Sequence, residues 1–317
     1  MAVVDKNRTD VPLSQAKIPI SLRVKAWWDG NELQVRPKGR GGDGSDGGDS
    51  DLDIPTRTLD RPTLLQALWG NGLCDPGPEE YLLQLVKPLG LDPSMTVLHL
   101  GAGLGGAARA MVEHFGPWVL GLESDKELAA AGMALSEGAG MAKKAEILYF
   151  NPVEHTYRPN TADAVLSKEF FWRVNDKDRM IMAAHTLLKE RGQLLFTDYV
   201  LAEGTNESDL TAWADRESES FSLWTQAQYE EILEARKLDV RISEDITKDY
   251  VRLVTDGWGS FLKNSRIDDL CPETGGALIR EAEIWTERVK AMDEGQVNVQ
   301  RFYAIKKTSS GLTMSDW

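Results

Sequence analysis

The sequence predicts an α/β fold built on a doubly wound, mostly parallel sheet. From about residue 96 onward, apolar segments with strand character alternate with helical segments, a pattern typical of parallel sheets. The first strand segment, 96–100, runs into a turn in which four of the six residues 101–106 are glycine, and a helical segment, 107–115, follows directly. A strand, a glycine turn and a helix in this order are typical of a sheet that binds a nucleotide-like cofactor.

The glycine turn is suited to a ligand that carries a negative group. Glycine has no Cβ, so the backbone can bend sharply and approach a ligand closely, and the start of the next helix offers free N–H groups. The spacing Gly101-x-Gly103-x-x-Gly106 matches the dinucleotide fingerprint, and Glu123 follows 20 residues after Gly103, where an acid that binds ribose belongs. This match alone leaves three alternatives open: a nicotinamide dinucleotide, S-adenosylmethionine, or a turn without a ligand.

The remaining elements follow the same alternation. The helix at 226–238 begins at a capping box made by Thr225 and Gln228, and the helix at 176–190 is expected to end at Gly192. The expected strands lie at 118–123, 146–150, 162–167, 193–198, 239–243 and 301–307, with a further helix at 126–137 and mostly helical material between 249 and 295.

The N-terminal part differs in composition. We expect residues 1–60 to form an extension with a flexible Gly/Asp linker at 39–51, and residues 308–317 to form a tail. A calcium-binding Gly-Asp repeat is disfavoured because the linker shows no strict nonapeptide period. Two helical segments, 62–72 and 78–87, lead into the first strand, and we expect them to pack over the mouth of the cofactor site.

Composition excludes several functions. Fifty acidic residues against 36 Lys and Arg give a net charge of −14, which disfavours nucleic acid as a partner. The two cysteines and four histidines have no metal-ligand spacing, so no metal site is predicted. With no signal peptide pattern and no apolar run of about 18 residues, we expect no membrane span and a cytoplasmic location.

Residues 61–307 resemble class I S-adenosylmethionine-dependent methyltransferases of the small-molecule type. Besides the glycine turn and Glu123, the resemblance rests on 162–167 (ADAVLS), on 187–194 (LLKERGQL) and on the strand that ends at 304–307. It implies a Rossmann-like core at 61–203 that binds S-adenosylmethionine. Residues 204–307 would then supply the rest of the sheet, with an antiparallel last strand and a helical cap. The implied reaction is an in-line methyl transfer to a small molecule.

The resemblance also implies roles for single residues. The turn residues Gly101, Ala102 and Gly103 would border the methionine end of the cofactor, and Glu123 with Ser124 would bind the ribose. The loop residues Asn151, Pro152 and Val153 would lie at the adenine, and Ser167 beneath the cofactor. The chain departs from the family at His99 and Asn151, where Asp is common, and at Arg173, where His is common. These departures keep open a non-catalytic partner or regulatory protein on the same fold, and a NAD(P)-dependent oxidoreductase is a third alternative.

The acceptor pocket is less clearly marked, and no catalytic residue is assigned. Candidates are Trp69, Glu169 and Trp172, in a chain with ten tryptophans. Segment 204–250 carries 12 acids against 5 bases; aromatic rings beside carboxylates suit an amine through cation–π attraction. Composition favours the plainer interpretation that the tryptophans are core and the acids a solvated helix face, and a lipid-like or natural-product acceptor would use the aromatics alone. The N-terminal extension is compatible with an arm that reaches the other subunit of a homodimer.

Overall fold

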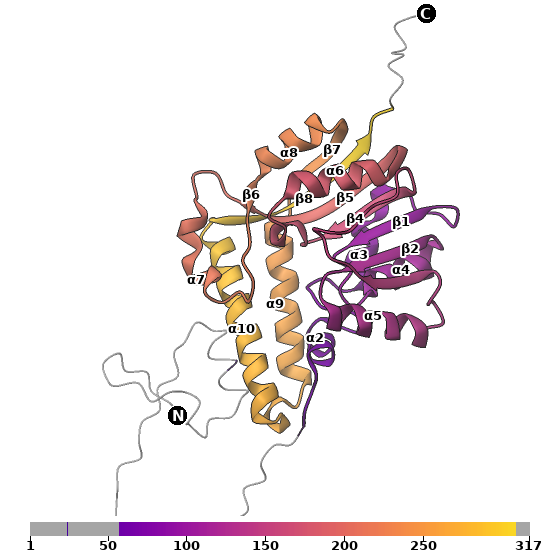
Figure 1. Cartoon of the computed structure of the whole chain (residues 1–317). Coiled ribbons are helices and arrows are strands. Elements are labelled where there is room, and N and C mark those ends of the chain that lie inside the picture. Colours follow the sequence, from indigo (N-terminus) through magenta and orange to yellow (C-terminus); the bar gives the residue numbers. More distant parts are fainter. Residues whose placement is uncertain (1–23, 25–56, 309–317) are drawn as a thin grey trace, which may run out of the picture.

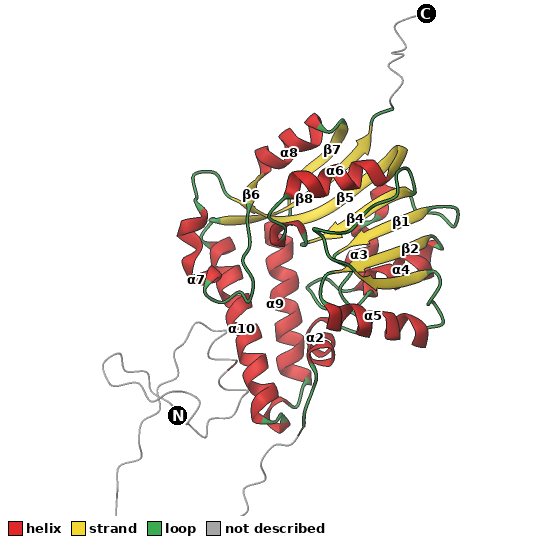
Figure 2. Ribbon diagram, in the orientation of Figure 1, coloured by secondary structure: helices red, strands yellow, loops and turns green. Residues whose placement is uncertain are grey.

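The protein is described by a computed structural model that covers Val24 and residues 57–308. The expected linker at 39–51 therefore lies outside the described residues, as do the rest of the extension apart from Val24 and 57–60 and the tail apart from residue 308. Within them, eight strands form one sheet with the order β3-β2-β1-β4-β5-β8-β7, and the short β6 pairs with β5 (Figures 1 and 2). The strands are β1 (Thr96–Leu100), β2 (Trp118–Glu123), β3 (Ala145–Tyr149), β4 (Ala162–Lys168), β5 (Leu188–Leu201), β6 (Trp224–Thr225), β7 (Leu238–Asp245) and β8 (Val297–Lys306).

The sheet has the predicted mixture of strand directions. β8 runs antiparallel to both of its neighbours, β5 and β7, whereas the other strand pairs are parallel. The predicted α/β class with an antiparallel last strand is therefore confirmed. None of the helices among the described residues is both long enough and apolar enough to cross a membrane.

Helices cover both faces of the sheet. α3 (Glu79–Leu85) and α4 (Gly106–Phe115) bury Leu85 and Met111 against one face. α6 (Lys177–Leu187) and α8 (Gln226–Ala235) bury Ile181 and Leu233 on the other. α5 (Lys126–Gly138) begins at Asp125, whose side chain accepts hydrogen bonds from the second and third backbone N–H groups of the helix.

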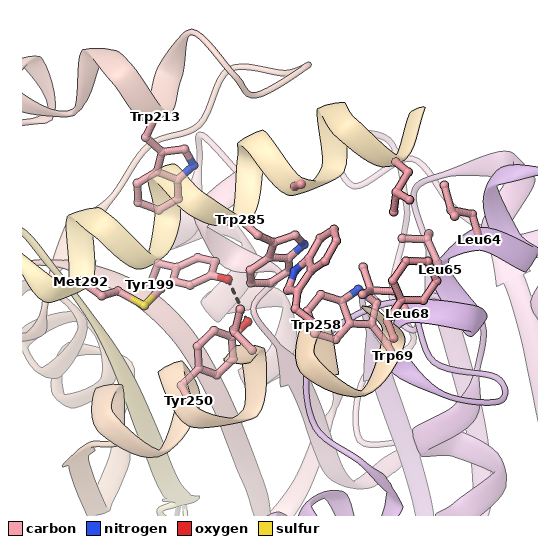
Figure 3. Packing of buried hydrophobic residues seen from close by; sticks show 14 of the residues in the cluster. Leu64, Leu65, Leu68, Trp69, Tyr199, Trp213, Tyr250, Trp258, Trp285 and Met292 are labelled. Carbon is pink, nitrogen blue, oxygen red and sulfur yellow. Dashed lines mark hydrogen bonds between the residues drawn. The ribbon is translucent and has the colours of Figure 1, made fainter. Parts of the chain in front are cut away.

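The predicted helical region near the C-terminus forms two long helices. α9 (Thr247–Asn264) and α10 (Pro272–Asp293) lie side by side and project beyond the sheet, with α2 (Arg61–Trp69) against α9 (Figure 1). Trp69, Trp258 and Trp285 meet between them, with ring centroids 6.4 Å and 4.9 Å from that of Trp69 (Figure 3). The short α7 (Thr211–Ala214) contributes Trp213 to the same hydrophobic cluster.

The predicted end of the helix at 176–190 is wrong. α6 ends at Leu187, and Gly192 lies inside β5 instead of capping the helix. The reason is tertiary: Leu188 is already extended and pairs with Ala162 of β4. In place of a glycine cap, Lys306 Nζ donates hydrogen bonds to the carbonyl oxygens of His185 (2.8 Å) and Leu188 (2.6 Å).

We expect Lys306→Met to destabilise the protein by about 1–3 kcal/mol, because a partly buried and a buried carbonyl group lose a charged donor. Urea unfolding of the variant measures this change. Lys307→Met is the matched control, since Lys307 is exposed and should change stability by less than about 0.5 kcal/mol. Equal effects of the two substitutions would contradict this account of the helix end.

Candidate cofactor site

The glycine turn at the end of β1 is tied to the neighbouring strand. The N–H groups of Gly101 and Ala102 both donate to the carbonyl oxygen of Leu122, at 2.9 Å and 3.1 Å. Gly101 and Gly103 have φ angles of +70° and +53°, which residues with a Cβ rarely adopt. The turn therefore needs glycine at these positions for its own shape, before any ligand is considered.

Glu123, at the end of β2, points at this turn. Its two carboxylate oxygens accept hydrogen bonds from the N–H groups of Gly103 (2.7 Å) and Asp125 (2.8 Å). The residue is 7 % exposed. Burial raises the pKa of Glu123, while the two N–H donors and the charge of Arg173 oppose that rise. Since a carboxylate has about four lone-pair sites, two remain to accept hydrogen bonds from hydroxyl groups, so this residue fits a ribose diol.

The loop between α2 and α3, residues 70–78, covers the turn. A Cβ on Gly103 would lie 2.2 Å from Cys74 Sγ, and one on Gly101 would lie 2.7 Å from the side chain of Phe170. The cavity left between the loop and the turn is about 20 Å³, room for about one water molecule. Of the two helices predicted to pack over the site, α3 contributes Leu82 to the lining of this cavity, whereas α2 packs mainly on α9; most of the cover comes from the loop between them.

A cluster of charged residues lies at the same cavity. Lys168, the last residue of β4, forms ion pairs with Asp75 of the covering loop and with Glu169 (2.7 Å). Burial by itself would lower the pKa of Lys168, but the carboxylates of Asp75 and Glu169 outweigh it and raise the pKa. Glu169 also accepts a hydrogen bond from Thr197 Oγ1 (2.6 Å). Sequence reasoning missed Asp75 and Lys168, because neither stands in a recognisable motif.

His99 lines this cavity from β1. It is buried, and neither ring nitrogen has a hydrogen-bond partner among the residues that the structure describes. Burial lowers the pKa of His99 to about 4, with a smaller contribution from Lys168, while Asp75 acts in the opposite direction. The ring is therefore neutral at pH 7. Unpartnered polar atoms in a buried place are uncommon, so His99 is a candidate ligand-binding group.

This pKa predicts a pH dependence of stability. His99 binds a proton near pH 6.5 in the unfolded chain but only near pH 4 in the folded protein. The contribution of the neutral His99 ring to the free energy of unfolding is fully present above pH 6.5. It is lost as the pH falls toward 4, by up to about 1.4 kcal/mol per pH unit. We expect His99→Phe to flatten the pH dependence of the unfolding free energy, measured in urea, between pH 6.5 and 5. The same slope in wild type and His99→Phe would refute this.

The other predicted cofactor residues lie in different surroundings. Ser167 lies opposite Leu100 in the β1–β4 register and is fully buried. Ser124 follows Glu123 and is exposed. Asn151 follows β3 and accepts a hydrogen bond from the N–H of Val153 (3.0 Å), which leaves Val153 67 % exposed. Pro152 lines a separate shallow hollow next to α6.

The predicted acceptor residues divide into two environments. Glu169 lies at the charged cluster described above, whereas Trp69 and Trp172 are buried in the hydrophobic core. Two cations lie over these rings. The guanidinium of Arg288 of α10 lies 5.1 Å from the ring centroid of Trp172 and 4.7 Å from that of Trp285, and that of the exposed Arg173 lies 4.8 Å from the centroid of Trp172. Arg288 also pairs with Glu217 at 2.7 Å. A signal was available, since Arg288 follows Trp285 by three residues on the buried stripe of α10.

A doubly wound sheet with a glycine turn and a ribose-type acid defines a class of cofactor-binding α/β proteins. Within this class, residues 78–241 match the profile of the family described as "Methyltransferase domain". This match covers more than half of the chain, and the protein belongs to this family. The predicted family is thereby confirmed.

Known relatives agree with this assignment. Phosphoethanolamine N-methyltransferase 1 of Triticum aestivum is 24% identical over 76% of this chain and 47% of its own length. The chain thus spans about half the length of the curated relatives it matches first. A phosphoethanolamine N-methyltransferase 2 structure from Haemonchus contortus has a TM-score of 0.66 at 21% identity, covering 78% of this chain and 57% of that one. A putative sarcosine dimethylglycine methyltransferase of Galdieria sulphuraria has a TM-score of 0.63 at 21% identity, covering 72% and 85%. At these identities the two structures show the fold alone.

Proposed function

We propose that the protein transfers the methyl group of S-adenosylmethionine to the nitrogen of a small amine. The observation that carries the proposal is the buried carboxylate of Glu123, hydrogen-bonded to the glycine turn at Gly103 (2.7 Å) in a chain of the methyltransferase-domain family. The sulfonium of this cofactor, when bound, supplies an electrophilic methyl group.

The residues around the turn would bind and orient this cofactor. Glu123 and Ser124 would accept hydrogen bonds from the ribose hydroxyl groups. Gly101, Ala102 and Gly103 would border the methionine end. The segment 151–153 would lie toward the adenine, and Ser167 beneath the cofactor. Because an in-line displacement mainly needs alignment and exclusion of water, this arrangement needs no metal ion.

An amine acceptor is favoured over a lipid-like one by the charged cluster. Glu169 places a carboxylate directly after β4, and segment 204–250 carries 12 acids against 5 bases; a surplus of negative charge favours a cationic guest. Relatives named for phosphoethanolamine and for sarcosine and dimethylglycine act on small amines that also carry an anionic group. We therefore place compounds of this kind first among acceptors to be tested. Trp69 and Trp172 would act by supporting the walls of the site.

Calorimetric titration with S-adenosylmethionine, S-adenosylhomocysteine and NAD tests the cofactor. We expect micromolar binding of the first two and a loss of about 100-fold or more in Glu123→Ala, because a buried ribose would lose its acceptor. Glu137→Ala, on the exposed end of α5, is the control. Transfer of a labelled methyl group to phosphoethanolamine, glycine and sarcosine then tests the activity.

Other outcomes would point to the alternatives. Binding without transfer to any acceptor would favour a non-catalytic partner or regulatory protein, and binding of NAD alone would favour an oxidoreductase. A cytoplasmic location, a homodimer and the absence of a nucleic-acid partner stay predictions. Light scattering on the full chain would measure the number of subunits.

A further inference from the structure

The cavity beside the glycine turn is lined by two opposite charges that come from different parts of the fold. Asp75 lies on the covering loop, 93 residues before Lys168 at the end of β4, and the two side chains form an ion pair. The same cavity is lined by Gly101, Ala102 and His99. An ammonium and a carboxylate are thus already paired next to the turn that would border the methionine end of the cofactor.

We propose that Asp75 and Lys168 bind the amino and the carboxylate groups of the cofactor's methionine end, and that their ion pair opens when the loop 70–78 moves away from the glycine turn. This inference rests on the proposed function. An α-amino acid group carries one positive and one negative charge, so it can insert between the two side chains with each charge meeting its opposite. Lys168 would exchange the carboxylate of Asp75 for that of the ligand, and Asp75 would receive the ligand's ammonium.

The burial of the two side chains supports this exchange. The side chain of Lys168 is 4 % exposed and that of Asp75 is 35 % exposed, so Asp75 is the partner nearer to solvent. Lys168 keeps Glu169 as a second partner at 2.7 Å, so it stays paired while Asp75 moves. An unpaired buried charge would be strongly unfavourable, and the second carboxylate avoids that state.

Packing shows why the loop has to move. A cavity of about 20 Å³ holds about one water molecule, which is far smaller than an amino acid group. Cys74 Sγ lies against Gly103, and the carbonyl oxygen of Gly72 lies 2.4 Å from where a Cβ on Gly106 would be. The loop begins at Gly70 and includes Gly77, and these two glycines have φ angles of +114° and +117°. Glycine at both positions permits backbone rotation that other residues would resist.

His99 completes the arrangement. The residue lines the same cavity, and its two ring nitrogens have no hydrogen-bond partner among the described residues. A neutral imidazole has one donor and one acceptor, so it can bond to either charged group of the ligand. This gives a role to a residue at which the chain departs from its family.

The test compares ligands that differ only in the amino acid end. We expect Lys168→Met to lower the affinity for S-adenosylhomocysteine by about 30-fold or more, measured by calorimetric titration. Binding of 5′-methylthioadenosine, which lacks both groups, should change by less than about threefold. Decarboxylated S-adenosylhomocysteine keeps the amine, so it should lose affinity in Asp75→Asn but not in Lys168→Met. Lys189→Met is the matched control, since Lys189 pairs with Asp163 in another ion pair, at 2.8 Å.

Each outcome decides the proposal. Equal weakening of all three ligands, or no weakening of any, would overturn it. If wild type binds the adenosine ligands and the variants bind like wild type, only this inference fails; if wild type binds none of them, the proposed function fails with it. Near-UV circular dichroism checks folding. If Lys168→Met does not fold, the ligands are compared in Asp75→Asn alone. The side chain of Asp75 is partly exposed, and its substitution leaves Lys168 paired with Glu169.

Discussion

Replacing Arg288 by methionine should destabilise the protein by about 3–5 kcal/mol, the typical effect of removing one partner of a buried ion pair. Both Arg288 and Glu217 are 7 % exposed at the side chain, and Glu217 also accepts a hydrogen bond from Trp213 Nε1. The variant would leave the carboxylate of Glu217 buried without its cation. It would also remove the guanidinium from the rings of Trp172 and Trp285.

Urea unfolding followed by tryptophan fluorescence measures this loss. Arg280→Met is the matched control, because Arg280 is exposed on the same helix and should cost less than about 0.5 kcal/mol. The double variant Glu217→Gln/Arg288→Met should recover part of the stability, since it removes the buried carboxylate that the single variant leaves unpaired. A loss below about 1 kcal/mol in Arg288→Met would contradict the assigned role of Arg288 as the buried partner of Glu217.

Gly103→Ala should reduce affinity for S-adenosylhomocysteine by about 100-fold or more, since the new Cβ would project into the space that the cofactor needs. In the free protein the Cβ would lie 2.2 Å from Cys74 Sγ. The double variant Cys74→Gly/Gly103→Ala should therefore regain stability without regaining affinity. Thermal unfolding and calorimetric titration measure the two effects separately.

Gly90→Ala is the control for backbone strain. Gly90 has a φ angle of +55°, close to the +53° of Gly103, but a Cβ there would meet nothing within 4 Å. It should lose a similar amount of stability from its backbone conformation and keep its affinity. If Gly90→Ala lowered the affinity for S-adenosylhomocysteine as much as Gly103→Ala, steric exclusion at the turn would not be the cause of the lost affinity.

The turn and its acid were predictable because they are local. Residues 96–106 place an apolar strand directly before four glycines, and Glu123 ends the next apolar run. Strand and helix periodicity fixed most elements to within a few residues. The end of α6 was not predictable in this way, because the donor that satisfies its last carbonyl groups is Lys306, more than 100 residues further along the chain.

The sequence by itself determined the fold class, the glycine turn with Glu123, and the family, since each is written in the order and periodicity of neighbouring residues. Only the tertiary structure decided which charges meet. Asp75 and Lys168 are 93 residues apart, and Glu217 and Arg288 are 71 apart; no local pattern pairs them. The physical reason is that burying a charge is unfavourable unless an opposite charge arrives at the same place, and the packing of the loop, sheet and helices supplies that coincidence.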